Sequence, residues 1–377
     1  MQELKRIINY KRIILLLIAV TVNVVFFLYD NKPVMDEDII NKENVAHETY
    51  IKNYHEEVNA IIDNADKLKK YSIFNKAGSF SYANILQTAR DFERVKNVIL
   101  PEDEYKGVQA YTTYYYQYFF TMLVMMFVIY DMFAQRDNGM WSITYSCANG
   151  RIMYAIKQTR VIVVTGAFTH TLIYWSTFIA AMLQRGGVRD LVNPVQTIET
   201  FDKFTYPWSK IKYVTVLYLI SMVCIVAICI TIWGVFVMFR NRVYALVTML
   251  IFAAVEQFIY SHIDIHSVWN GLHYINIINI ININATFSSY RNWGVGTYVF
   301  PVFSVVLFVH IICAGVIGYI AINVSASMKP YKNTTFIKRF TDCVSAGCQK
   351  ILARIPFLFK EIHKFIFTSH CGWVVVV

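Results

Sequence analysis

The chain has 377 residues, of which 56% are hydrophobic, 16% aromatic and only 16% charged, and its formal net charge is +10. Ordinary soluble domains carry about 25% charged and 45–50% apolar residues, and disordered chains are richer still in charge. The composition therefore excludes an ordinary soluble protein, a disordered chain and, with 15 Gly and 7 Cys, a collagen-like or disulfide-built scaffold, which leaves an integral membrane protein.

Six apolar stretches are long enough to cross a bilayer as helices, which takes about 20 residues. The first, Ile13–Tyr29, follows a basic start and precedes no small-residue cleavage site, so we interpret it as a retained anchor and not as a signal peptide. The other five are Tyr111–Phe133, Val161–Leu183, Tyr213–Phe239, Val243–Tyr260 and Thr297–Ile322. The sequence thus predicts an all-α membrane protein with six transmembrane helices.

Residues 30–110, between the first and second spans, form the one sizeable polar part of the chain. Apolar residues repeat there at helical spacing on both sides of a break at residues 75–79. The pattern predicts an extracytoplasmic domain of two antiparallel helices, a hairpin standing on the membrane. This hairpin is either a structural cap or a binding surface for a substrate or partner, and the sequence leaves both open.

The membrane domain, residues 111–328, contains an unusual segment at residues 261–296. Between Tyr274 and Asn284, asparagine recurs every two or three residues among isoleucines. Such a stretch is too polar to cross a bilayer and too apolar for a free loop, so we expect an interfacial or re-entrant element packed on protein. Residues 329–377 after the last span are basic and amphipathic, which predicts a cytoplasmic helix lying on the inner leaflet or docked on a partner.

The distribution of charge predicts the orientation of the chain. With the N-terminus inside, the inner segments hold 18 Lys and Arg residues and four acidic residues, whereas the outer segments hold 17 basic and 19 acidic residues. Basic residues near span ends favour the cytoplasmic side. We therefore expect a multi-pass protein of the cell membrane, a bacterial plasma membrane, with both termini cytoplasmic. The positive excess faces membrane lipids, and we expect no nucleic-acid partner.

The loop between the second and third spans, residues 134–160, carries the most informative pattern. Asp137 precedes Gly139 and Trp141, an apolar segment follows, and Arg151 and Lys157 lead into the third span. This pattern resembles the first cytoplasmic loop of ABC transporter permeases of the type-two exporter class, and the six-span plan with an insertion after span one is similar too. Two departures are that Asp137 stands where the family often has Glu, and that the chain has no ATPase domain of its own.

The resemblance implies that this loop forms a coupling helix in a groove of a separate ABC ATPase subunit, which would bind ATP and Mg. It also implies a second copy of this permease or a paralogous one. The chain itself contains no phosphate-binding loop, so we expect no cofactor and no catalytic site in it. The alternative is that the basic residues of this loop contact no ATPase and only anchor the span ends at the lipid headgroups.

Ionisable residues inside spans are functional candidates by default. Asp131, near the inner end of span two, is expected to pair with a nearby base such as Arg136 or to lie at the interface. Glu256, in the outer half of span five, is expected to stay protonated, to pair across a subunit interface or to contact substrate. His170 and His310 are expected to be packing residues, with a role in transport as the alternative.

The end of the fifth predicted span and the segment after it contain residues that would suit a metal site or an enzyme. His262, Asp264 and His266 are weak candidates for metal ligands, because imidazole and carboxylate suit zinc but this spacing is common. Phe258–His262 and His266–Asn270 are similar to two motifs of the intramembrane metallopeptidases that process prenylated proteins. That family also needs a Glu-Glu pair in a span, and none of the predicted spans has one.

Together these features predict a permease subunit that exports an amphiphilic substrate, such as a hydrophobic peptide or a lipid. The alternative is a receptor or immunity protein that transports nothing and binds a ligand through its outer hairpin.

Overall fold

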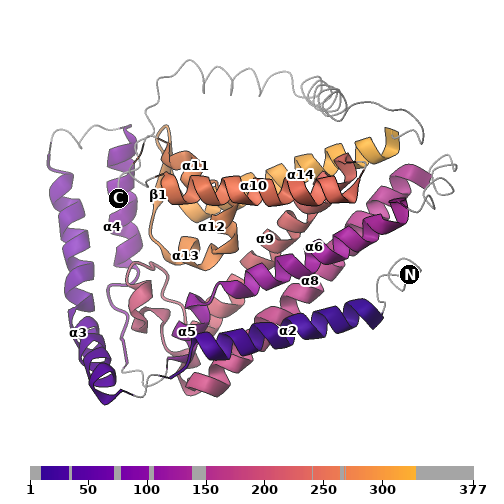
Figure 1. The fold of residues 1–377 in the computed structure, drawn as a ribbon. Helices are drawn as coiled ribbons and strands as arrows, with labels where there is room; N and C mark the ends of the chain where they lie inside the picture. Colours follow the sequence, from indigo (N-terminus) through magenta and orange to yellow (C-terminus); the bar gives the residue numbers. More distant parts are fainter. Residues whose placement is uncertain are drawn as a thin grey trace.

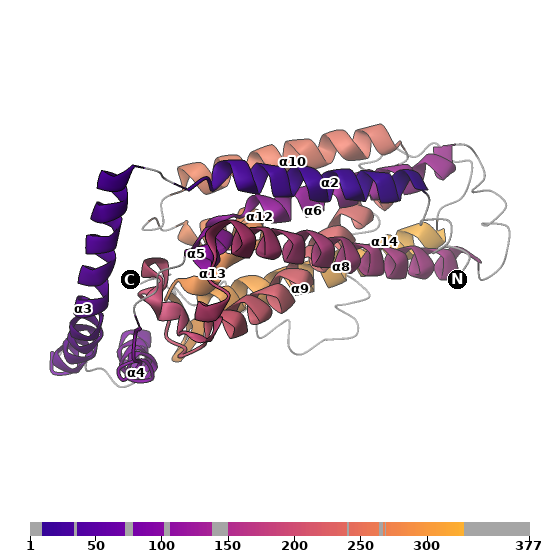
Figure 2. The same cartoon turned by 90° about the horizontal axis from the view of Figure 1, so that it is seen from below.

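The computed structural model describes residues 10–33, 36–71, 78–101, 106–137, 150–239, 241–263, 267 and 269–327. Within them, six helices are long and apolar enough to cross a membrane, which supports the predicted multi-pass, mainly helical architecture. They run in alternating directions through one bundle, so that Tyr10 and Ser327 lie at the same end (Figures 1 and 2). The six helices are α2 (Tyr10–Asp30), α6 (Tyr116–Asp137), α8 (Gly150–Arg185), α9 (Lys210–Met238), α10 (Arg242–His262) and α14 (Val302–Ser327).

Two further helices, α3 (Glu37–Leu68) and α4 (Phe80–Glu93), lie across one end of this bundle, crosswise to the long helices (Figures 1 and 2). We call this the capped end, and we call the other end, where α6 ends and α8 begins, the opposite end. The 32 residues of α3 are about 48 Å long at 1.5 Å per residue. The helix pair therefore extends over the bundle end and does not stand upright on it.

The α3–α4 pair has capping residues at its helix starts and a small hydrophobic core of its own. The carboxylate of Asp36 accepts a hydrogen bond from the amide of Asp38 at the start of α3, and the hydroxyl of Ser79 accepts one from the amide of Tyr82 in α4. The two helices pack through one buried cluster that is separate from the core of the bundle. That cluster consists of Tyr54, Val58, Phe92 and Val95.

Helix α9 forms the centre of the bundle and packs against α6, α8 and α14. It buries 61% of its most apolar stretch, whereas α10 buries 6% and α2 buries 11%. Small residues bring α9 close to its neighbours: Gly166 of α8 lies against Cys229, and Gly234 lies beneath Ile317 of α14. Helices α2 and α10 therefore present most of their apolar surface to the surroundings.

The second and sixth spans begin later than the sequence predicts. Residues Gly107–Thr113 form a separate short helix, α5, that packs on α8, and the chain breaks at Tyr114 before α6 begins. Residues 292–301 form an antiparallel hairpin of β1 (Asn292–Val295) and β2 (Tyr298–Pro301), with Val295 opposite Tyr298. The last residues of both short elements adjoin the apolar stretches that follow, so the predicted spans include residues 111–113 of α5 and residues 297–301 of the hairpin.

Three short 3₁₀ turns connect α8 to α9: η1 (Arg189–Val192), η2 (Val195–Thr197) and η3 (Glu199–Phe201). The buried side chain of Gln196 holds this connection together, since its amide donates to the carbonyls of Phe204 at 3.0 Å and Tyr206 at 2.7 Å. The connection between α8 and α9 is therefore a compact platform at the capped end.

The asparagine-rich segment folds into three short helices, α11 (Asn270–Tyr274), α12 (Ile277–Ile281) and α13 (Ile283–Ser288). Its amide side chains replace hydrogen bonds that a continuous helix would supply. Asn276 caps α12 through the amide of Ile278 at 2.8 Å, and Asn279 donates to the carbonyl of His273 at 2.6 Å. Asn284 accepts from the hydroxyl of Tyr213 at 2.7 Å and donates to the carbonyl of Thr112 at 2.7 Å.

Candidate functional site

The residues predicted to couple to an ATPase lie at the opposite end. Asp137 is the last residue of α6, and Arg151 and Lys157 lie in the first turns of α8, half-buried and exposed respectively. Gly139 and Trp141, together with the side chain of Asp137, are outside the described residues. Helix α8 begins at Gly150, well before its apolar stretch, so Arg151 and Lys157 occupy a helical extension at that end (Figure 1).

Asp131 in the last turns of α6 forms an ion pair with Arg12 of α2. The Nε of Arg12 donates to Oδ2 of Asp131 at 3.0 Å, and its Nη2 contacts the same oxygen. The sequence suggested a base nearby in the chain, such as Arg136, but this partner is 119 residues away. The carboxylate is 59% exposed, so the pair contributes on the order of 0–1 kcal/mol to stability.

The same end of α6 also contacts α9 and α10. The guanidinium of Arg242, at the start of α10, lies 4.6 Å from the ring centroid of Tyr130, and the rings of Phe133 and Phe236 in α9 pack with centroids 5.6 Å apart. The helix that leads into the loop at residues 138–149 is thus joined to α2, α9 and α10 within its last two turns. A displacement of that loop would reach three other spans directly.

Glu256 in α10 holds the start of α12. Its Oε2 accepts a hydrogen bond from the amide of Ile277 at 3.0 Å, and its backbone carbonyl accepts one from Nδ2 of Asn276 at 2.8 Å. The three roles expected from the sequence did not include a contact within the chain. The carboxylate therefore fixes the asparagine-rich segment to α10.

The two intramembrane histidines contact neighbours within the bundle. The Nε2 of His170 lies 2.8 Å from the hydroxyl of Ser221 in α9, and the imidazole is stacked between the rings of Tyr118 and Tyr218. The Nδ1 of His310 lies 2.8 Å from the carbonyl of Val306 in its own helix. Each imidazole thus has one partner within the bundle, and a packing role stays the prediction for both residues.

Of the three weak candidates for metal ligands, the structure describes only His262. His262 stacks on Phe258 with centroids 4.1 Å apart, and its Nδ1 lies 3.0 Å from the carbonyl of that residue. Asp264 and His266 are outside the described residues. Across the part of the chain that the structure describes, no three His, Cys, Asp or Glu side chains come together in a group that could hold a metal ion.

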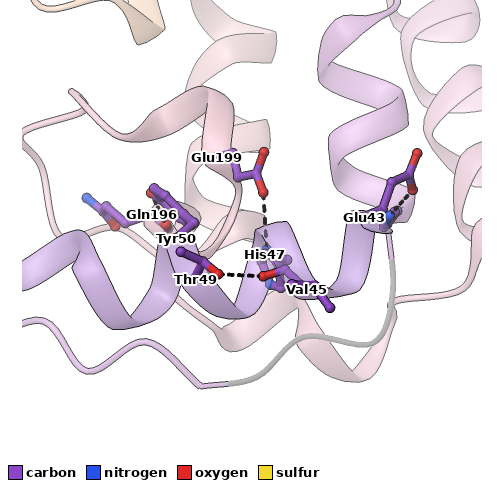
Figure 3. A network of polar contacts seen from close by, with 8 residues as sticks. Glu43, Val45, His47, Thr49, Tyr50, Gln196 and Glu199 are labelled. Carbon is purple, nitrogen blue, oxygen red and sulfur yellow. Dashed lines mark hydrogen bonds and ion pairs between the residues drawn. The ribbon is translucent and has the colours of Figure 1, made fainter. Parts of the chain in front are cut away.

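At the capped end, α3 is tied to the platform between α8 and α9 by polar contacts (Figure 3). The hydroxyl of Tyr50 donates to the carbonyl of Gln196 at 2.8 Å, and Nδ1 of His47 lies 3.9 Å from Oε1 of Glu199. Burial raises the pKa of the Tyr50 hydroxyl, so it remains a neutral donor at physiological pH. Lys106, just before α5, pairs with Glu43 of α3.

Helix α4 is tied to the β-hairpin by a more deeply buried network. Asp91 is 8% exposed and accepts hydrogen bonds from the hydroxyl of Tyr290 at 3.0 Å and the amide of Gln87 at 2.9 Å. Nδ2 of Asn292 donates to Oδ1 of Asn84 at 2.9 Å. Burial raises the pKa of the Tyr290 hydroxyl, which therefore stays protonated and able to donate.

Sequence reasoning missed Asn23, a fully buried residue of α2. Its Nδ2 donates to Oγ1 of Thr177 at 2.7 Å, and its Oδ1 accepts from the hydroxyl of Tyr114 at 3.1 Å. The sequence offered one signal for this role, since Asn23 is the single amide side chain in an apolar span. Asn23 joins α2 to α8 and to Tyr114, where the chain breaks before α6.

Comparison of the chain with protein-family models, curated proteins and solved structures finds no match. Its function is therefore inferred from the residues and contacts described above.

Proposed function

We propose that this chain is the permease subunit of an ATP-driven ABC exporter, energised by a separate ATPase chain at the loop between α6 and α8. The observation that carries the proposal is the position of α6. It leads directly into the loop and is joined there to α2, α9 and α10 through Asp131, Tyr130 and Phe133. A partner that moves the loop would therefore move several spans together.

The residues proposed to contact the ATPase are Asp137, Gly139, Trp141, Arg151 and Lys157. The basic groups of Arg151 and Lys157 suit acidic side chains on a partner, which would favour correct orientation and fast association. The partner would bind ATP and Mg, and in this chain the loop between α6 and α8 would transmit the partner's movement to the spans. In this arrangement the opposite end of the bundle would face the cytoplasm and the α3–α4 pair would lie outside. Residues 329–377, proposed to form the inner-leaflet helix, are outside the described residues.

A second permease chain, identical or paralogous, would cover the least buried helices, α2 and α10. Helix α10 carries an exposed amide side chain, Gln257, in its outer half among exposed apolar residues. Polar side chains in a membrane favour a protein neighbour over lipid. The surfaces rich in aromatic residues and isoleucine favour an amphiphilic substrate over an ion.

The proposal is tested by purifying the tagged chain from its native host in mild detergents and in lipid nanodiscs. We expect a stoichiometric P-loop protein to co-purify and to hydrolyse ATP. The exposed Lys157 is changed to Glu, and the matched control is Lys52→Glu at the capped end, where the lysine is 76% exposed. Lys157→Glu is expected to reduce the co-purified ATPase several-fold and Lys52→Glu to leave it unchanged.

Failure to find an ATPase in any detergent or in nanodiscs would overturn the proposal. The chain would then be better explained as a receptor or immunity protein, which the separate core of the α3–α4 pair favours. If an ATPase is found, its rate in the reconstituted complex should rise with amphiphilic peptides or lipids. A response to small polar solutes alone would contradict the proposed substrate class.

A further inference from the structure

The α3–α4 pair connects two parts of the capped end that are far apart in the sequence. Helix α3 contacts the platform between α8 and α9, and α4 contacts the β-hairpin that precedes α14. Arg94, directly after α4, also lies over the ring of Tyr206 in the platform, 5.7 Å from its centroid. We propose that this pair is a strap across the bundle end, hinged at the hairpin through α4 and latched on the platform through α3, and that the latch opens while the hinge holds.

The hinge is built from buried groups. Asp91 accepts two hydrogen bonds from neighbouring side chains and also lies 3.1 Å from the guanidinium of Arg94. The ring of Phe92 packs on the ring of Tyr290 with centroids 5.1 Å apart. Phe80 covers Gly294 so closely that a side chain there would collide with its ring. Separating α4 from the hairpin would uncover a buried carboxylate and aromatic surface, both of which are costly.

The latch is built from fewer contacts, and its ion pair is exposed. The hydrogen bond from Tyr50 to the carbonyl of Gln196 is part-buried, like the bond from Tyr290 to Asp91 in the hinge. The side chains of the pair formed by His47 and Glu199 are 25% and 47% exposed. Beside the latch, α3 also pairs with the chain before α5 through Glu43 and Lys106, whose side chains are 48% and 41% exposed. Ion pairs surrounded by water contribute little to stability, so these contacts break more often than those of the hinge.

The strap moves as one body because α3 and α4 share their own core. Release of the latch would uncover the surface of the platform that α3 contacts, while α8 and α9 stay packed on α14. This inference concerns the capped end alone and does not depend on transport or on an ATPase.

The test is amide hydrogen exchange, followed by mass spectrometry, of the full chain in lipid nanodiscs. In the wild-type protein, peptides covering residues 195–206 should exchange faster than peptides covering residues 290–301. Tyr50→Phe removes only the hydroxyl of the latch and should speed exchange of 195–206 by about threefold to tenfold, without changing 290–301. Glu199→Gln should have a smaller effect on the same peptides.

Two matched controls use the same chemical change. Tyr290→Phe removes the hinge hydroxyl and should speed exchange in α4 and residues 290–301. Tyr71→Phe alters an exposed tyrosine, 62% accessible, and should change neither region. Equal exchange on both sides of the wild-type strap, or an equal rise on both sides in Tyr50→Phe, would overturn the proposal in favour of a rigid cap. Faster exchange at 290–301 than at 195–206 would also overturn it.

Discussion

Glu256 stands in an apolar helix, and its carboxylate accepts the first amide hydrogen of α12. A short helix next to the membrane has backbone groups that no continuous helix satisfies, and these must find partners in side chains. Glu256, Asn276 and Asn279 supply such partners for the segment between α10 and β1. Polar residues in this part of the chain are therefore first of all structural.

Replacing Glu256 tests this role directly. Glu256→Ala removes the acceptor of a part-buried hydrogen bond and should destabilise the protein by about 1 kcal/mol. Glu256→Gln keeps a carbonyl oxygen at the same position and should cost much less. Thermal or chemical unfolding in detergent measures both. Equal losses in the two variants would indicate that the negative charge itself matters and would return Glu256 to the functional candidates.

Gly107 is a second residue whose identity is dictated by its neighbours. A Cβ at this position would collide with the backbone carbonyl of Gly186 and with the side chain of Met182, where α5 meets the end of α8. Gly107→Ala should therefore destabilise the protein by about 1–3 kcal/mol, as overpacking does. The control is Gly315→Ala in α14, where a Cβ would meet nothing within 4 Å. A thermal midpoint that falls equally in both variants would contradict this assignment.

At the scale of helices, α2 is attached to α6 by contacts at both ends. Asn23 joins it to α8 and to Tyr114 before α6, and Arg12 joins it to Asp131. The first contact is buried, whereas the second is partly exposed to solvent or headgroups. Most of the attachment energy therefore comes from packing and from Asn23.

The ion pair can be measured by a double-mutant cycle. Arg12→Ala, Asp131→Ala and the double variant should give a coupling free energy of about 0.2–1 kcal/mol, because the carboxylate is largely exposed. Exchanging the two charges, with Arg12→Asp and Asp131→Arg together, should recover most of the loss caused by either reversal alone. Additive effects in the cycle would show that the two residues do not interact.

Hydropathy predicts the six long helices, because crossing a bilayer requires long continuous apolar stretches and the chain has few others. It misplaces the starts of the second and sixth spans, because the last residues of α5 and of the β-hairpin adjoin those spans but are shaped by contacts with α8 and α4. The partners of Asp131 and Asn23 could not be predicted either. They lie 119 and 154 residues away, and only the folded bundle brings them together. Turn chemistry is local: within the break predicted at residues 75–79, of which the structure describes the last two, Gly78 adopts a positive φ of 85° directly before α4.

For the whole molecule, the testable quantity is its orientation in the membrane. A cysteine replacing Glu48 on α3 should react with a membrane-impermeant maleimide in intact cells, and a cysteine replacing Lys157 on α8 should react only after the cells are permeabilised. Both positions are exposed, so accessibility to the reagent depends on the side of the membrane. The parent chain provides the background from the native cysteines. The reverse pattern would place the α6–α8 loop outside and rule out a cytoplasmic ATPase as its partner.

The crosswise position of α3 and α4 also constrains how the chain is made. Asn84 and its partner Asn292 are separated by 208 residues, and the same distant region supplies Tyr290 to Asp91. At about 5–20 residues per second, ribosomal synthesis takes roughly 10–40 seconds to cover that interval. During this time the newly made pair has its own small core but no docking surface for Asp91. Helix α4 can dock only once residues 290–301 have been synthesised, so capping of the bundle is a late step of biogenesis.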